Sequence, residues 1–372
     1  MKRFFCIVLL FTSSLSSYLL AEPRQMFEKK SQTSQFICPP CYHNRDTQKV
    51  HEHDGQCPIC GMNLIEKHSL DTLNTIQITA GSGNFLLEGG ASHPEKWISV
   101  FYHKPKNFNE QSPVLMVIPG AGRNAWDYRD SWIAASERYH VLILSLAYTK
   151  ENYDLAAYHM GGVIKNIQLN NVEGAKSGKP LSVYRMKDED IVFDINRDTA
   201  AWIFHDFDRL FERVKHALGT NQQRYDLFGH SAGGQILHRL VLFKPLSKAN
   251  RILASNAGFY TLADLDSPLL FGLKGTGIDK DGLQDSFSQK LTLFIGEKDN
   301  ESETRGTMLF TPLADQQGLG RFSRGKYFFN TGKEQAKALN MPFNWSLEIV
   351  NNVGHDYRAM GEAAARYLYG DK

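Results

Sequence analysis

Ser231 stands in the part of the chain that is best suited to do chemistry. Residues 225–234 read YDLFGHSAGG, so this serine lies at the centre of a Gly-x-Ser-x-Gly pattern. A short apolar run precedes the pattern and a helical pattern follows it, which is the setting of a nucleophile elbow. Gly229 and Gly233 leave room around a serine that is held on a sharp, strained turn. The segment therefore predicts a nucleophilic serine rather than an incidental serine in a glycine-rich turn.

A base and a carboxylate that can serve this serine follow later in the chain. A serine hydroxyl becomes a nucleophile when a base takes its proton, and the base needs an acid to orient it. Asp299 and His355 each follow an apolar run that predicts a buried strand, and with Ser231 they have the order Ser, Asp, His. Parallel sheets bring such residues together beyond the carboxyl ends of their strands. Asp264 and Asp266, after the preceding predicted strand, are the alternative acids.

Two backbone N–H groups are expected to bind the negative oxygen of a reaction intermediate. One is the N–H of Ala232, the residue after the serine. The second should come from the loop after an early predicted strand, whose residues 119–122 read PGAG. Ala121 is the first candidate for that donor and Gly120 is the second.

Strands and helices alternate along most of the chain, which indicates the α/β class with a mostly parallel sheet covered on both faces. The clearest helical pattern covers residues 201–218, with apolar side chains on one face. Residues from about 153 to 190 fit neither pattern and are predicted to form a cap over the site. The predicted strands are residues 97–102, 114–118, 141–146, 225–228, 252–255, 291–295 and 347–350.

From about residue 97 to its end, the chain resembles the α/β-hydrolase superfamily, and most of all the secreted bacterial hydrolases of the esterase and polyhydroxyalkanoate-depolymerase-like type. The segments that carry the resemblance are residues 119–124, 229–234, 296–299 and 353–355. It implies an α/β-hydrolase domain over residues 75–372 that cleaves a small or medium ester through an acyl-enzyme, with no cofactor for catalysis. Pro119 stands where many relatives have histidine.

Four cysteines near the start of the chain have the spacing of a metal site. Cys38 and Cys41 form one C-x2-C pair, and Cys57 and Cys60 form a second after fifteen residues. This spacing suits four thiolate ligands around one ion, for which zinc is the default. Two disulfides are the alternative, because a secreted chain is open to oxidation. A unit of this size is expected to depend on the metal for folding.

Residues 57–62 read CPICGM, which resembles the end of the small heavy-metal-binding domain of bacterial copper and silver efflux proteins. The resemblance implies copper(I) as the competitor of zinc. Residues 36–66 are accordingly predicted to form a zinc-ribbon-like module with a structural or sensing role.

The first 21 residues have the layout of a secretory signal peptide. Lys2 and Arg3 precede a short apolar run, and a polar stretch leads to a possible cleavage point after Ala21. An N-terminal membrane anchor is the alternative, whereas no later segment is apolar for long enough to span a bilayer. Residues 22–35 are polar and are predicted to be a linker, so the chain is expected to be secreted or periplasmic.

The sequence leaves three function classes open. The first is a secreted serine esterase, and the second is a heavy-metal-binding protein that uses the hydrolase fold as a scaffold. The third is a serine peptidase with the same three residues. The formal net charge of +2 gives no general attraction to nucleic acid.

Overall fold

The computed structural model describes residues 35–37, 50–55, 58, 64–66, 76–90, 96–173 and 181–370. The predicted signal peptide, almost the whole predicted linker and all four cysteines lie outside these ranges. The signal peptide and the metal site therefore stay predictions. Within the described ranges, no cluster of three or more His, Cys, Asp and Glu side chains is arranged to hold a metal ion.

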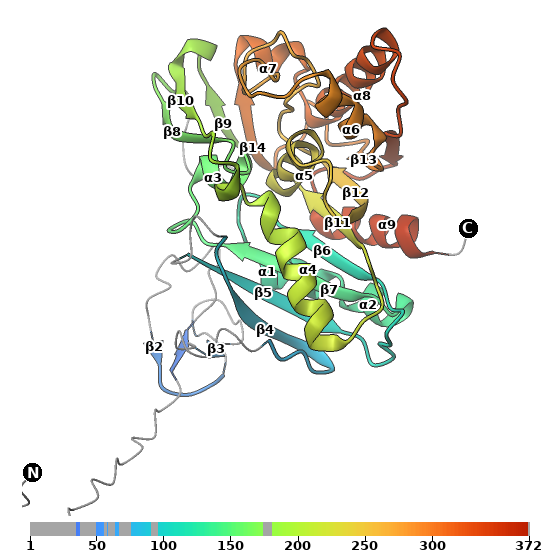
Figure 1. Ribbon diagram of the computed structural model, residues 1–372. Helices are drawn as coiled ribbons and strands as arrows, with labels where there is room; N and C mark the ends of the chain where they lie inside the picture. Colours follow the sequence, from blue (N-terminus) through green and yellow to red (C-terminus); the bar gives the residue numbers. More distant parts are fainter. Residues whose placement is uncertain are drawn as a thin grey trace, which may run out of the picture.

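The described residues build a central sheet of eight strands, in the order β15-β13-β12-β11-β6-β7-β5-β4 (Figure 1). The strands from β15 to β7 run parallel, whereas β5 is antiparallel to both β7 and β4. The predicted mostly parallel sheet is confirmed. The strands are β4 (Gly81–Glu88), β5 (Trp97–Lys104), β6 (Val114–Ile118), β7 (Leu142–Tyr148), β11 (Tyr225–His230), β12 (Ala249–Ser255), β13 (Leu291–Gly296) and β15 (Ser346–Val350).

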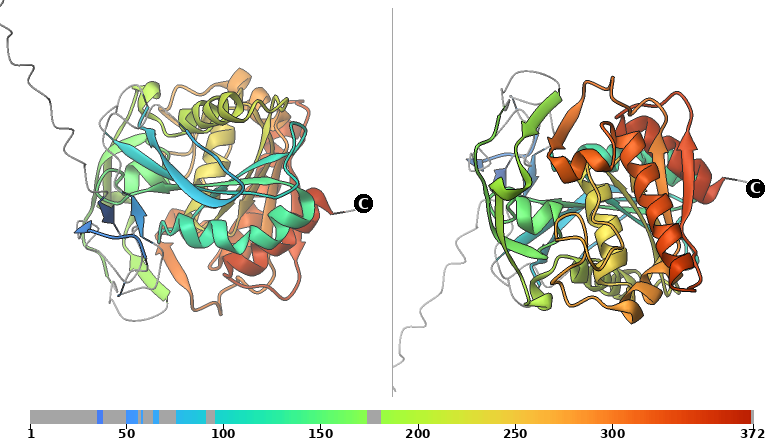
Figure 2. Two further views of the ribbon diagram at one scale, coloured as in Figure 1. Left: turned by 90° about the horizontal axis from the view of Figure 1, so that it is seen from below. Right: turned by 90° about the horizontal axis from the view of Figure 1, so that it is seen from above.

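Helices cover both faces of this sheet (Figure 2). One face packs against α1 (Ala125–Ser131), α2 (Ile133–Tyr139) and α9 (Tyr357–Tyr369). The other face packs against α4 (Phe204–Leu218), α5 (Ala232–Phe243), α6 (Lys280–Ser288) and α8 (Arg321–Ala338). The short helix α7 (Pro312–Gln316) follows the edge strand of a smaller sheet.

Strand β6 shows why the central strands are continuous apolar runs. Val114, Met116 and Ile118 pack into the core under α4 and α5, whereas Leu115 and Val117 pack into the core under α1 and α9. Each of these side chains is at most 1% exposed. A strand that is buried on both faces cannot alternate apolar and polar residues, so its sequence is apolar throughout.

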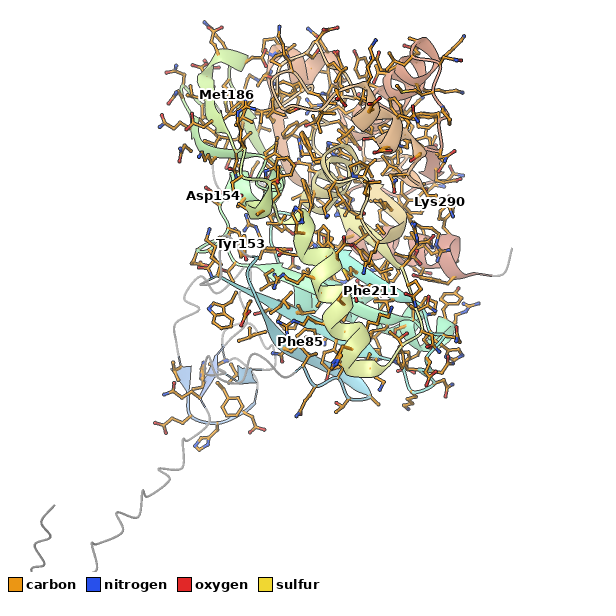
Figure 3. The ribbon with its side chains drawn as sticks, in the orientation of Figure 1. Phe85, Tyr153, Asp154, Met186, Phe211 and Lys290 are labelled. Atoms are coloured by element: carbon orange, nitrogen blue, oxygen red, sulfur yellow. The ribbon has the colours of Figure 1, made fainter. Side chains whose placement is uncertain are left out.

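The segment that was predicted to be a cap leaves the central sheet after β7. It contains α3 (Leu155–His159), β8 (Ile164–Leu169) and β9 (Leu181–Arg185), and β10 (Ile191–Ile195) follows directly after the predicted bounds of 153–190. Strands β8 and β10 pair antiparallel, and β9 pairs in parallel with the distant β14 (Gly306–Phe310). Figure 3 marks Tyr153 and Asp154 at the start of this segment and Met186 further along it.

Three two-residue strands in the N-terminal region pair with one another. They are β1 (Phe36–Ile37), β2 (Val50–His51) and β3 (Ile65–Glu66), in the order β2-β1-β3 with antiparallel pairing. Among the described helices, none is both long and apolar enough to cross a membrane.

Candidate active site

Ser231 occupies a sharp turn between β11 and α5. Its backbone angles are φ 59° and ψ −115°, which a non-glycine residue rarely adopts. The turn is tightly enclosed, because a Cβ atom at Gly229 would collide with the carbonyl of Gly233, and one at Gly233 would collide with the carbonyl of Ile118. The two glycines are therefore required by close backbone approach. The Ser231 N–H donates to the Ser255 carbonyl at 2.9 Å, which ties the turn to β12.

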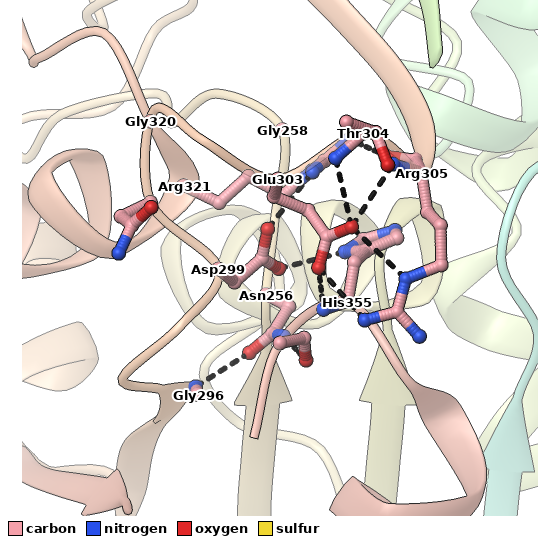
Figure 4. A network of polar contacts seen from close by, with 12 residues as sticks. Asn256, Gly258, Gly296, Asp299, Glu303, Thr304, Arg305, Gly320, Arg321 and His355 are labelled. Atoms are coloured by element: carbon pink, nitrogen blue, oxygen red, sulfur yellow. Dashed lines mark hydrogen bonds and ion pairs between the residues drawn. The ribbon is translucent and has the colours of Figure 1, made fainter. Parts of the chain in front are cut away.

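The structure brings His355 and Asp299 into direct contact. The loops after β15 and β13 carry the two residues, and His355 Nδ1 lies 2.7 Å from Asp299 Oδ2 (Figure 4). Asp299 is 1% exposed and His355 is 9% exposed. The carboxylate accepts a hydrogen bond from the Nδ1–H group, so the Nε2 lone pair of the neutral ring is available as a base.

The two alternative acids belong to a local turn instead. Asp264 accepts hydrogen bonds from the Asp266 N–H, at 2.9 Å, and from the Ser267 hydroxyl. Asp266 is exposed. Of the three candidates within the described residues, Asp299 is the one whose carboxylate is hydrogen-bonded to His355.

Arg321 is a second partner of Asp299 that the sequence did not indicate. Its Nη1 atom donates to Asp299 Oδ1 at 2.9 Å, and its side chain is 2% exposed. Its Nη2 atom donates to the carbonyls of Arg305 and Thr307. Both carboxylate oxygens of Asp299 are thus engaged, one by an arginine and one by His355. A buried arginine at the start of a helix has no signature in the sequence that would have revealed this role.

Burial and charge together keep His355 neutral. Burial lowers the pKa of the imidazole from its usual 6.5, and the positive charge of Arg321 lowers it further. The hydrogen bond and the charge of Asp299 act in the opposite direction. A neutral ring can accept a proton, which is what a general base must do.

Glu303 fixes the backbone that carries His355. Its carboxylate accepts the His355 N–H at 2.6 Å and pairs with Arg305 at 2.8 Å (Figure 4). The Arg305 hydrogen bonds lower the pKa of Glu303 to about 2, against the opposing effect of burial. Gly306, at the start of β14, touches the far edge of the imidazole, since a Cβ there would lie 2.8 Å from His355 Nε2.

The loop after β6 lies directly against the serine. A Cβ atom at Gly120 would be 3.3 Å from Ser231 Cβ. The Gly120 N–H is already used, because it donates to the Tyr128 hydroxyl at 3.1 Å. The Ala121 N–H has no acceptor within the described part of the chain, and the Ala232 N–H belongs to the first residue of α5, where no helical acceptor exists. This favours Ala121 over Gly120 as the second donor.

Tyr128 connects this loop to the turn that carries Ser231. Its hydroxyl lies 3.2 Å from Nδ1 of His230, the residue before Ser231, and its side chain is 3% exposed. Burial raises its pKa well above 10, so the hydroxyl keeps its proton. It can accept from Gly120 and donate to His230 at the same time. The sequence did not indicate this bridge, because the three residues come from three different elements.

A cavity of about 480 Å³ opens beside Ser231. Ala121 and Ala232 line it at the serine, so both candidate oxyanion donors border the same space. Half of its lining residues come from the segment after β7, and the apolar and aromatic side chains among them are Tyr153, Leu155, Met160, Ile167, Leu169, Tyr184 and Ile191.

Arg123 lines the same cavity but is held by backbone groups. Its guanidinium donates to the carbonyls of Tyr148, Thr149, Tyr153 and Asp154. It also stacks at 4.1 Å over the ring of Tyr158. The arginine therefore fastens the start of the cap segment to the end of β7.

Comparison with solved structures places the chain among hydrolases. It is 30% identical to poly(aspartic acid) hydrolase-1 from Sphingomonas sp. KT-1, with 79% of this chain aligned to the whole of that one at a TM-score of 0.66. It is 26% identical to LpqC, a poly(3-hydroxybutyrate) depolymerase from Bordetella parapertussis, with 78% and 91% of the two chains covered and a TM-score of 0.65. No protein-family model matches the chain. No curated protein matches it either. By its sheet topology and its similarity to these enzymes, the chain belongs to the α/β-hydrolase family and is a hydrolase.

Proposed function

We propose that this hydrolase cleaves carboxylic esters through an acyl-enzyme. Ser231 Oγ attacks the ester carbonyl while His355 Nε2 takes the hydroxyl proton. Asp299 accepts the Nδ1 hydrogen bond and stabilises the imidazolium that forms. The negative oxygen of the tetrahedral intermediate is bound by the N–H groups of Ala121 and Ala232.

The proton moves in the opposite direction when the tetrahedral intermediate breaks down. His355 donates its proton to the leaving alcohol, and the carbon–oxygen bond to that alcohol breaks. Water then attacks the acyl-Ser231 ester and gives its proton to His355. The carboxylic acid leaves and Ser231 regains its proton, so no cofactor is consumed.

One observation supports this proposal most: His355 Nδ1 lies 2.7 Å from Asp299 Oδ2. Ser231, in the same protein, has the backbone angles of a nucleophile elbow. The largely apolar cavity at Ser231 suits the acyl chain of an ester. The test compares p-nitrophenyl esters with the matching p-nitroanilides. Turnover of esters alone supports an esterase, comparable turnover of anilides supports a peptidase, and turnover of neither favours the scaffold interpretation.

The acid limb of the pH–rate profile is expected to lie below pH 6.5. His355 must be neutral to take the Ser231 proton, and burial together with Arg321 lowers its pKa below 6.5. As the pH falls, the ring therefore stays unprotonated past its usual pKa, and kcat/KM is lost only at lower pH. The measurement is kcat/KM for a neutral ester from about pH 4 to pH 9. A half-maximum above pH 6.5 would contradict this account.

Replacing Tyr128 by phenylalanine should lower kcat about tenfold and leave KM nearly unchanged, because it removes the hydroxyl that links the Gly120 N–H of the oxyanion loop to His230. Steady-state kinetics with a thermal melt measures this. Tyr357→Phe is the matched control, since Tyr357 stacks on Tyr128 at 4.2 Å but its hydroxyl binds Asp127. An equal loss in the two variants would show that the effect is general packing.

A further inference from the structure

One polar side chain faces the cavity a single helical turn from the nucleophile. Gln235 lies on α5 four residues after Ser231, and its N–H donates to the Ser231 carbonyl at 3.0 Å. Gln235 is in the first turn of α5, which begins directly after Ser231, and both residues line the cavity. Gln235 is 7% exposed and lines the cavity, so a group bound covalently to Ser231 lies within its reach.

The Gln235 carboxamide is oriented by His159. His159 Nδ1 lies 3.3 Å from Gln235 Oε1, so the ring can donate its proton to the amide oxygen. The amide Nε2 then carries two N–H donors, which have no acceptor within the described residues. Gly258 makes room for this nitrogen, since a Cβ there would lie 2.9 Å from it. The geometry leaves these donors to a ligand in the cavity.

His159 acts as a neutral group. Burial lowers its pKa to about 3, and the positive charges of Arg123 and Arg239 contribute to the shift. Arg239 also donates to the carbonyls of His159 and Gln235, at 2.9 Å and 3.2 Å, which fixes the two backbones relative to one another. The pair formed by Gln235 and His159 is therefore uncharged and held in place.

The charges that border the cavity do not form a carboxylate site. The Arg123 guanidinium donates to four backbone carbonyls, as described above. Lys150 and Asp154, both exposed, line the cavity with opposite charges. A substrate carboxylate that bound at Gln235 would leave water for a neutral amide, which is costly.

The cavity is placed to hold the acyl part of an ester. The cavity is lined by Ser231, Ala121 and Ala232. His355, which would protonate the leaving alcohol, is not among the described residues that line the cavity. The acyl group stays attached to Ser231 after the alcohol departs. The space bordered by the serine and the oxyanion donors is thus the space that the acyl group fills.

We infer that Gln235 is a specificity-determining residue, which donates a hydrogen bond to an uncharged acceptor oxygen in the acyl chain. This rests on the proposed esterase function. The substrates it selects are esters whose acyl chain is apolar apart from one keto, ether or ester oxygen, a few bonds from the scissile carbonyl. A carboxylate at that place is disfavoured.

Three ethyl esters of similar size test the inference by pH-stat: ethyl 4-oxopentanoate, ethyl 4-methylpentanoate and monoethyl succinate. For the native protein, kcat/KM should be about tenfold higher for the keto ester than for each of the others. In Gln235→Leu, the preference for ethyl 4-oxopentanoate over ethyl 4-methylpentanoate should vanish, with hydrolysis of ethyl 4-methylpentanoate retained. Gln168→Leu, on the exposed side of β8, is the matched control and should keep the native preference.

The outcomes separate the two proposals. If the native protein and Ser231→Ala are equally inactive on all three esters, the esterase proposal fails, and this inference with it. If the native protein hydrolyses the esters but Gln235→Leu keeps the native preference, the inference about Gln235 alone is wrong. A native preference for monoethyl succinate would also overturn it.

Discussion

Replacing Ser231 by alanine is expected to lower kcat for p-nitrophenyl ester hydrolysis by about 10⁴- to 10⁶-fold. The hydroxyl is the nucleophile of the proposed reaction, and neither water nor a neighbouring group can take its place in the same geometry. Because the acyl-enzyme cannot form, the burst of nitrophenol should also disappear. Stopped-flow and steady-state rates measure both effects.

The variant should stay folded, because alanine keeps the φ 59° turn and removes a single oxygen atom. A thermal melt close to that of the native protein would show that lost activity is lost chemistry. Ser288→Ala, on an exposed position at the end of α6, is the matched control and should keep the native rate. Equal rates for Ser231→Ala and the native protein would contradict the proposed nucleophile.

Replacing Asp299 by asparagine should lower kcat by about 10⁴-fold. The amide can present its NH₂ group to Nδ1 in place of an acceptor oxygen, so the His355 tautomer that exposes a basic Nε2 loses its support. The change also removes the buried anion from Arg321, whose side chain is 2% exposed and 2.9 Å from Asp299. Breaking one side of a buried ion pair costs about 3–5 kcal/mol, so the thermal midpoint should fall as well.

Asp264→Asn gives the sharpest control for this prediction. Asp264 is one of the two alternative acids, with Asp266, yet its carboxylate is hydrogen-bonded within its own turn. Its replacement should leave kcat within about twofold of the native value, because surface turns tolerate such changes. Loss of activity in Asp264→Asn together with full activity in Asp299→Asn would reverse the assignment.

Much of the fold could be predicted because the buried strands are short apolar runs with polar residues at their carboxyl ends. All seven predicted strands are present, and the predicted helix at 201–218 is α4, Phe204–Leu218. Strand β4 escaped prediction, since the start of its sequence, GSGN, has neither β-branched nor alternating apolar residues. It is defined by pairing with β5 along its whole length.

The parts of the site that could not be predicted depend on contacts between distant segments. Arg321, at the start of α8, donates a hydrogen bond to Asp299. Glu303 accepts the backbone N–H of His355, more than fifty positions later in the chain. The cavity takes shape because β9 pairs with β14, over a hundred positions away. Charged residues such as these look like surface residues in the sequence, and their partners emerge from the tertiary structure alone.

Labelling with a fluorophosphonate, followed by mapping of the modified peptide, tests the central proposal most directly. The reagent phosphonylates a serine whose hydroxyl is activated by a neighbouring base. We expect one label per chain, on Ser231, and no label in Ser231→Ala. A label on any other residue, or an unlabelled native protein, would contradict the proposed serine hydrolase mechanism.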